Sequence, residues 1–176
     1  MDLQLAIYLT ALCEEGQYQP AGMLYFKIDE PVLDKKDAID AESYEKAMMK
    51  KLRMDGLVLE DEEILTAMDA MYAAGSEVIP VKRTKDGLFD KNSKVATAGE
   101  FAAISKHAKS TVKKLCNEIL GGMSAVSPTK NACTYCEMKA LCGFDTTVSG
   151  YGYREIEKLK DNDALLKIIE EGKGNE

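Results

Sequence analysis

The chain contains the stretch Cys133-Thr134-Tyr135-Cys136-Glu137-Met138-Lys139-Ala140-Leu141-Cys142, which holds three of its five cysteines. Two residues separate the first pair of thiols and five separate the second pair. Thiolates bind soft metals, and a Cys-x-x-Cys step lets two sulfurs reach one centre from a tight turn. Structural zinc and iron–sulfur centres take four protein ligands. The stretch therefore predicts a metal centre that is one ligand short.

Candidates for the fourth ligand within the chain are few. Cys13 and Cys116 lie on apolar faces of predicted helices without a neighbouring thiol, so we expect them to be small core residues. His107 is the only histidine and lies beside the apolar stripe of a basic helix, where a structural role is usual. A zinc-binding interaction module completed by one of these residues, or a helical scaffold with reduced cysteines, stays open as an alternative.

Composition places the chain among globular proteins that keep their thiols reduced. It has 176 residues, of which 45% are hydrophobic and 30% charged, enough for one domain or slightly more. No apolar run approaches the roughly 20 residues of a membrane span. Residues 1–4 lack the basic start of a secretory signal. We therefore expect a cytoplasmic protein in which cysteines bind metal or are buried.

Charge is distributed unevenly along the chain. The net charge of −7 disfavours nucleic acid as a partner of the whole surface. Residues 29–77 carry 14 acidic and 6 basic side chains, whereas residues 81–120 carry 9 basic and 4 acidic ones. One face can therefore approach phosphate while another repels it, although two solvated faces without a partner explain the pattern equally well.

Hydrophobic periodicity predicts a helix-rich α/β protein. A nearly all-apolar helix is expected over residues 2–15, a strand with two apolar faces, and hence a central one, over 21–28, and a short strand over 78–81. Further helices are expected over residues 41–53, with Gly56 as the stop, over 61–74 with Met71 facing inward, and over 151–171. Thr97 and Glu100 form a capping box that opens a helix running to Leu120.

Familiar catalytic motifs are absent or out of place. A metal-dependent nuclease needs clustered carboxylates and a supporting lysine. The Asp/Glu-x-Lys triplets begin at Asp34, Glu137 and Glu171, and none lies on a predicted strand. The chain has neither a Gly-rich phosphate loop nor a G-x-S-x-G nucleophile motif. These observations argue against an ATP site and a hydrolytic triad within the chain.

The segment Leu3-Gln4-Leu5-Ala6-Ile7-Tyr8 resembles the Q-x-x-x-Y motif of RecB-family nucleases in the PD-(D/E)XK superfamily. The order of the elements that follow is similar to the C-terminal part of the AddB family of helicase–deoxyribonuclease subunits. These elements are a strand, an acidic helical insertion over about 29–77, a long helix and the C-x-x-C-x5-C cluster. The resemblance implies a partial restriction-endonuclease-like core over 1–127 that lacks its first strands. A cysteine segment and C-terminal helix follow over 128–176. A CRISPR-associated nuclease with the same cysteine arrangement is an alternative that the long insertion disfavours.

The resemblance also implies cofactors and partners. Cys133, Cys136 and Cys142 would hold a 4Fe–4S cluster whose fourth cysteine lies outside this chain. Gln4 and Tyr8 would lie close to a Mg²⁺ centre and DNA, whereas the family's catalytic acids precede this motif. We therefore expect a part of a nuclease that is inactive alone. The parent would act in DNA double-strand-break repair with an AddA-type subunit. The exposed first helix would favour self-association.

Overall fold

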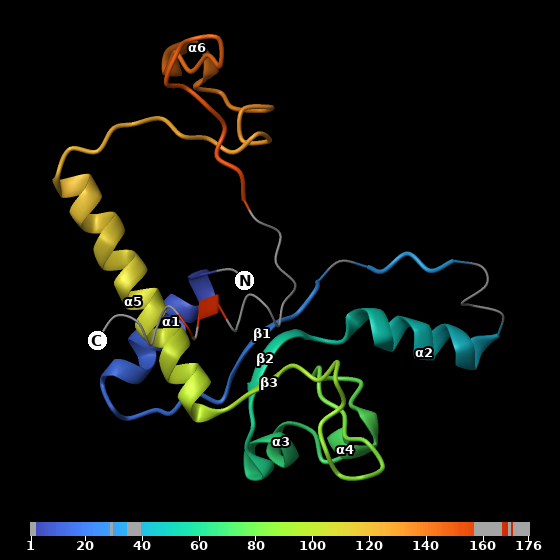
Figure 1. Cartoon of the computed structure of the whole chain (residues 1–176). Coiled ribbons are helices and arrows are strands. Elements are labelled where there is room, and N and C mark those ends of the chain that lie inside the picture. Colours follow the sequence, from blue (N-terminus) through green and yellow to red (C-terminus); the bar gives the residue numbers. More distant parts are fainter. Residues whose placement is uncertain (1–2, 29, 35–39, 157–166, 169, 171–176) are drawn as a thin grey trace.

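The computed structural model describes residues 3–28, 30–34, 40–156, 167–168 and 170. It is a mixed α/β fold rich in helix, as predicted (Figure 1). The helices are α1 (Leu3–Glu14), α2 (Ala41–Leu52), α3 (Glu62–Met68), α4 (Tyr72–Gly75), α5 (Ala98–Leu120) and α6 (Lys139–Cys142). The strands are β1 (Gly22–Tyr25), β2 (Asp55–Leu59) and β3 (Val95–Ala96). No helix in the described part of the chain is both long and apolar enough to cross a membrane.

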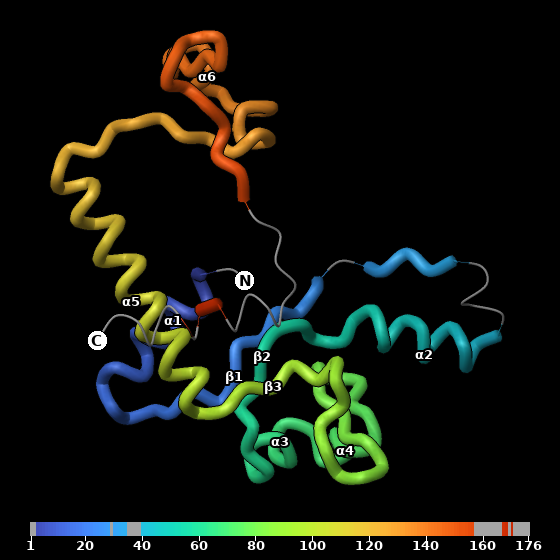
Figure 2. Tube along the Cα trace, viewed as in Figure 1, coloured from blue at the N-terminus to red at the C-terminus, as the bar shows by residue number. Residues whose placement is uncertain are grey.

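The described strands form one small sheet in the order β1-β2-β3 (Figure 2). β1 runs antiparallel to β2, with Met23 opposite Leu57, and β3 runs parallel to β2, with Val58 opposite Val95. The prediction of a central strand over 21–28 is therefore wrong in two respects. β1 pairs only with β2 within the described sheet, and it ends at Tyr25, beyond which no pairing with another described strand is present.

Gly56 lies inside β2 and does not stop the preceding helix. Its φ of +139° suits glycine, and a Cβ there would lie 2.0 Å from the carbonyl oxygen of Met23. Helix α2 begins after an Asp40–Ser43 capping box, close to the predicted start, and its last helical residue is Leu52, with Arg53 as the C-cap. The glycine is thus explained by the close approach of β1 to β2.

The first hydrophobic core joins α1 and α5 to the sheet. Its buried members are Ala6, Met23, Ala96, Phe101, Ile104 and Ala108. Small residues on both helices, Ala6 and Ala108, let the two backbones approach closely. Helix α1 is only partly buried, however, because Tyr8 and Leu12 are exposed. The expected self-association through this helix stays a prediction.

A second core lies under β2 and consists of Val58, Leu65, Tyr72, Ile79 and Val81. The predicted helix over 61–74 is interrupted at Asp69, whose side chain accepts a hydrogen bond from the backbone N–H of Met71. This local bond competes with helical geometry. Met71, expected to face inward, is exposed, and Tyr72 is buried in its place.

The predicted strand over 78–81 is a loop in which Val78 is exposed and residues 79–81 are buried. Pro80 has no N–H to give to a ladder, although its carbonyl accepts one bond from Lys94 at 2.8 Å. Ile79 and Val81 nevertheless point into the second core. A turn at Gly87 follows, and an isolated bridge pairs Arg83 with Phe89 across it.

The first half of helix α5 packs into the first core, whereas its last turns are exposed to solvent. The predicted capping box of Thr97 and Glu100 is confirmed. Its 23 residues extend about 34 Å, whereas the 12 of α1 extend about 18 Å. Because α1 covers only part of α5, Leu115 and Ile119 are exposed. Cys116, expected in the core, is exposed for the same reason, and Cys13 is half-buried.

The C-terminal helix predicted over 151–171 is wrong at its start, because residues 151–156 are not helical. Most of the remaining stretch lies outside the described residues. Of the Asp/Glu-x-Lys triplets, Asp34 and Glu137 lie on no strand, and the third is also outside the described residues.

Candidate functional site

Gln4 and Tyr8 lie one turn apart on the exposed face of α1. The amide nitrogen of Gln4 donates a hydrogen bond to the hydroxyl oxygen of Tyr8 at 2.9 Å. Residues at positions i and i+4 of a helix are neighbours, so the spacing of the motif itself creates this contact. The pair predicted from the sequence is therefore brought together, with Tyr8 55% exposed to solvent.

The opposite face of α1 holds this pair in position. Ala6 and Thr10 are buried, and α1 packs against α5. An ion pair between Lys109 and Glu14, with 2.8 Å between nitrogen and oxygen, adds a contact at the end of α1. The Gln4–Tyr8 pair is thus displayed by a helix that is anchored on one side and open on the other.

The three clustered thiols lie in a segment of turns. We call residues 128–156 the cysteine segment; in Figure 1 it stands away from the sheet. The backbone N–H of Lys139 bonds to the carbonyl of Cys136 at 3.3 Å, and that of Cys142 bonds to the carbonyl of Met138 at 2.9 Å. Cys133 is half-buried, Cys136 and Cys142 are exposed, and none forms a disulfide.

The ends of the cysteine segment are tied together. The backbone N–H of Arg154 donates to the carbonyl of Pro128 at 2.8 Å. The ring of Phe144 packs edge-on against Tyr151, with centroids 5.6 Å apart, and tilted against Tyr153, with centroids 5.2 Å apart. These contacts close the segment into a loop that carries all three thiols.

The donor chemistry fits a thiolate-held centre, but the donors are not assembled. Among the described residues, no group of three or more His, Cys, Asp and Glu side chains is placed to hold a metal ion. Cys13, Cys116 and His107 therefore do not complete a site with the three clustered thiols in this structure. Cys133, Cys136 and Cys142 supply the right type of ligand, and the set is one short of four.

A polar network that the sequence analysis missed lies beside the second core. The buried hydroxyl of Tyr72 donates to Glu62, and the guanidinium of Arg83 bonds to both of these side chains. Burial raises the pKa of Tyr72, which keeps the phenol neutral. Arg83 also donates to the carbonyl of Gly87 at 2.6 Å and stacks on Phe89. The network anchors the turn at 83–89, and no pairwise spacing in the sequence predicted it.

Comparison with known families explains why these elements occur together. The sequence profile of the PD-(D/E)XK nuclease superfamily matches residues 1–143, which include the Gln4–Tyr8 pair, the sheet, α5 and the three clustered cysteines. The chain belongs to the PD-(D/E)XK nuclease superfamily. The family expected from the Gln–Tyr motif is thereby confirmed, as is the helix-rich α/β fold.

Several similar proteins share one name, which describes each as the B subunit of an ATP-dependent helicase/deoxyribonuclease. The protein from Clostridium kluyveri is 40% identical over 179 residues, covering 96% of this chain and 16% of the relative. That from Thermoanaerobacter sp. is 36% identical and covers 93% of this chain and 15% of the relative. That from Caldanaerobacter subterraneus is 40% identical, with coverage of 97% and 15%. The chain thus spans about a sixth of the length of these relatives.

Proposed function

We propose that this chain is part of the nuclease domain of an AddB-type helicase–deoxyribonuclease subunit. Its superfamily, and the name shared by relatives that match over 93% of the chain or more, support this proposal. The whole protein would hydrolyse DNA phosphodiesters with Mg²⁺ during double-strand-break repair in the cytoplasm. It would work beside an AddA-type helicase–nuclease subunit, and ATP would drive the helicase activity.

The hydrogen bond between Gln4 and Tyr8 is the observation that carries the proposed contact with DNA. Because the Tyr8 oxygen accepts from Gln4, its own O–H hydrogen is left to donate elsewhere. Within the described part of the chain this hydrogen has no acceptor. A phosphate oxygen of DNA is a suitable acceptor, and such a charge-assisted bond is strong. We infer that the pair positions the strand beside the catalytic centre.

The chain alone is inferred to be inactive. Mg²⁺ prefers oxygen ligands, chiefly carboxylates. Since the described residues bring no three Asp, Glu, His or Cys side chains into a metal-holding group, they do not fit a complete Mg²⁺ site. The contribution of this chain to the reaction is therefore to bind and orient DNA, and the catalytic acids would come from another part of the whole protein.

Cleavage of linear DNA tests the role of Tyr8. In the whole protein, Tyr8→Phe removes only the hydroxyl, and loss of a hydrogen bond to a charged group is worth about 1.5–3 kcal/mol, or roughly 10- to 150-fold in kcat/KM. Tyr44→Phe, at an exposed tyrosine on α2, is the matched control and should leave the rate unchanged. Equal rates for the Tyr8 variant and the unchanged protein would contradict the assignment.

The 176-residue chain tests the inferred inactivity. We expect no Mg²⁺-dependent cutting of linear DNA by the purified chain. Cutting that needs Mg²⁺ and disappears in a Gln4→Ala variant would show that the chain carries a complete centre. This result would leave the family assignment intact and overturn only the inference that the acids lie elsewhere.

We further propose that Cys133, Cys136 and Cys142 supply three of the four ligands of a 4Fe–4S cluster. The spacing of the thiols, their location in one closed loop and the absence of disulfides among them support this. The fourth thiolate would come from outside this chain. When bound, the cluster would tie the cysteine segment to a distant part of the protein through metal–sulfur bonds.

Metal analysis separates the cluster from zinc. The whole protein, purified without oxygen, should be brown and contain iron and acid-labile sulfide in about equal amounts. Cys136→Ser should lower the iron content strongly, whereas Cys116→Ser, at an exposed thiol on α5, should not. Colourless protein with stoichiometric zinc would support a zinc-binding module instead, and iron unaffected by Cys136→Ser would overturn the ligand assignment.

A further inference from the structure

A cavity of about 550 Å³ opens between the segment after β1, the last turn of α2 and the start of β2. This volume is within the roughly 300–1,000 Å³ of small-ligand sites. Among the described residues, its basic lining residues are Lys27, Lys50, Lys51, Arg53 and Lys94, and the only acidic one is Asp55. Three of the five cations come from a stretch that the sequence analysis assigned to an acidic insertion.

The one carboxylate that the described residues contribute to this lining pairs with a single cation. The Nζ atom of Lys94 lies 2.7 Å from the carboxylate oxygen Oδ1 of Asp55. The hydrogen bond from Lys94 lowers the pKa of Asp55, so this ion pair is present at neutral pH. Lys51 donates to the carbonyl of Val32, a bond that orients the ammonium without cancelling its charge. Among the described residues, neither Lys50 nor Arg53 forms an ion pair. The cavity therefore keeps an excess of positive charge.

Helix stability explains only part of this arrangement. Lys50 and Lys51 lie in the last turn of α2, where cations interact favourably with the helix dipole. Lys27 and Lys94 belong to other segments and line the same cavity from outside the helix. Cations from three parts of the chain meet here and repel one another unless an anion lies between them. Their arrangement therefore points to an anionic ligand.

The chemistry of the lining favours phosphate. An excess of cations excludes a metal ion, and guanidinium and ammonium groups are the usual partners of phosphate oxygens. None of the described residues that line the cavity is aromatic, so they offer no platform for stacking a base. A ligand recognised through its phosphates, independently of base identity, fits best.

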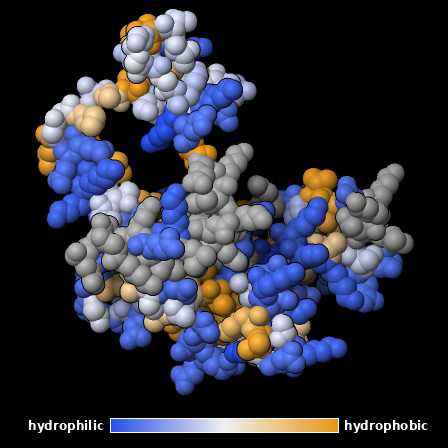
Figure 3. Space-filling model, in the orientation of Figure 1, coloured by the Kyte–Doolittle hydropathy of each residue, from blue (hydrophilic) through white to orange (hydrophobic). Residues whose placement is uncertain are grey.

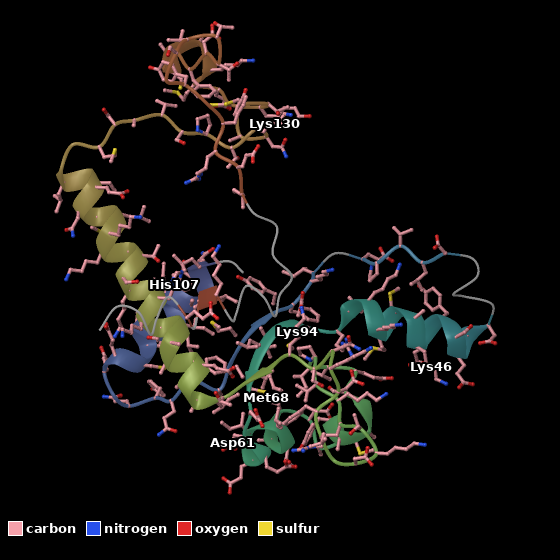
Figure 4. The ribbon with its side chains drawn as sticks, viewed as in Figure 1. Lys46, Asp61, Met68, Lys94, His107 and Lys130 are labelled. Atoms are coloured by element: carbon pink, nitrogen blue, oxygen red, sulfur yellow. The ribbon has the colours of Figure 1, made fainter. Side chains whose placement is uncertain are left out.

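We propose that this cavity binds the phosphate groups of a DNA strand, as a second contact apart from the Gln4–Tyr8 pair. In Figure 4, Lys94 lies beside the strands, α1 lies to their left and α2 extends to their right. The cavity would hold a strand at a distance from the catalytic centre. DNA as the source of the phosphate rests on the proposed function, whereas the phosphate chemistry rests on the cavity alone.

Binding of a labelled oligothymidylate to the 176-residue chain, measured by fluorescence anisotropy without Mg²⁺, tests the proposal. The variant is Lys50→Gln with Arg53→Gln. The control is Lys46→Gln with Lys113→Gln, which removes the same charge from exposed positions outside the cavity lining. Lys46 lies farther along α2, away from Lys94 (Figure 4).

The expected result is a change in salt dependence. Each phosphate contact contributes about −0.7 to the slope of log affinity against log salt for single strands, so losing two contacts makes the slope shallower by about 1.4. Between about 50 and 200 mM salt, the variant should lose about sevenfold less affinity than the unchanged chain. The control should lose as much affinity as the unchanged chain.

Pyrophosphate distinguishes the two sources of phosphate. If it binds the unchanged chain but not the variant, while oligothymidylate binding is the same in both, the DNA assignment is overturned and the site is one for a free phosphate compound. If pyrophosphate and oligothymidylate each bind the variant as they bind the unchanged chain, the proposal of a phosphate site in this cavity is overturned. Amide NMR shifts of the unchanged chain on titration with oligothymidylate provide a check that needs no variant, and they should include Lys27, Arg53 and Lys94.

Failure of this proposal is distinct from failure of the proposed nuclease role. The assay measures binding alone and contains no Mg²⁺, so a chain without catalytic acids still gives a signal. One outcome is that Tyr8→Phe loses cleavage, while the salt dependence of oligothymidylate binding is the same for the Lys50→Gln, Arg53→Gln variant and the unchanged chain. That outcome would support the nuclease role and reject the cavity. The reverse result would support the cavity and reject the role of Tyr8.

Discussion

The first half of α5 and the cysteine segment differ in what holds them in place. Phe101, Ile104 and Ala108 are each at most 3% exposed and pack against α1 and the sheet. The cysteine segment has no buried residue and stands apart as a lobe in Figure 3. Burial of apolar surface therefore stabilises the first region. Hydrogen bonds, three packed rings and, we propose, a cluster stabilise the second.

Because the two regions are stabilised differently, they need not unfold together. A segment that cannot bury a core of its own usually depends on a metal or disulfides. None of the five cysteines forms a disulfide in this structure. The cysteine segment is therefore expected to gain its order from the proposed cluster, whereas the sheet with α1 and α5 forms without it.

The greatest loss of stability is expected from a change in the buried region. Phe101→Ala, at a side chain 3% exposed, should destabilise the chain by about 3–5 kcal/mol because it leaves a cavity in the first core. Leu141→Ala, at a side chain 80% exposed in the cysteine segment, should change the free energy of unfolding by less than about 0.5 kcal/mol. Urea denaturation followed by circular dichroism measures both, and similar losses would show that the two regions are not stabilised differently.

A more modest change is expected within the cysteine segment. Phe144→Leu removes two ring pairs, each worth about 0.5–1.5 kcal/mol. Limited proteolysis should cut residues 128–156 faster in this variant, while the urea midpoint of the buried region stays the same. Tyr135→Leu, at an exposed ring 94% accessible to solvent, is the control and should not change the cutting rate. A lower urea midpoint in Phe144→Leu would show that the regions are coupled.

How much could be predicted from the sequence depended on the range of the interactions. The Thr97–Glu100 capping box and the Gln4–Tyr8 pair were predictable because each is decided within one helical turn. The edge position of β1 was not, because its partner β2 begins about thirty residues later. The end of α3 at Asp69 was not predictable either. The apolar pattern continues through this residue, and hydrophobic periodicity takes no account of the hydrogen bond that its side chain accepts from the backbone N–H of Met71.

The basic cavity escaped prediction for a related reason. Lys27, Arg53 and Lys94 are far apart in the chain, and averaging charge over residues 29–77 concealed the cations at the end of α2. The run Lys50-Lys51-Leu52-Arg53 was the one available signal. It indicated a helix end, and only the fold shows that cations from other segments meet it.

The weakest of the predicted changes concerns pH. The hydrogen bond from Lys94 lowers the pKa of Asp55 below its value in the unfolded chain. The pair therefore stabilises the fold above the unfolded pKa of about 3.9, and this contribution is lost as pH falls through the lower folded value. Asp55 is largely exposed, so the contribution is at most about 1 kcal/mol. Asp55→Asn should reduce the loss of stability between pH 5 and pH 2 by that amount, and an increased loss would contradict the sign.

Hydrogen exchange of the whole protein, measured by mass spectrometry with the proposed cluster present and after its removal by chelation, reports on both regions in a single experiment. We predict that amides of residues 98–108 stay protected in both states, while those of 128–156 are protected only with the cluster present. Equal protection of the cysteine segment in both states would contradict the claim that a thiolate-held cluster orders it.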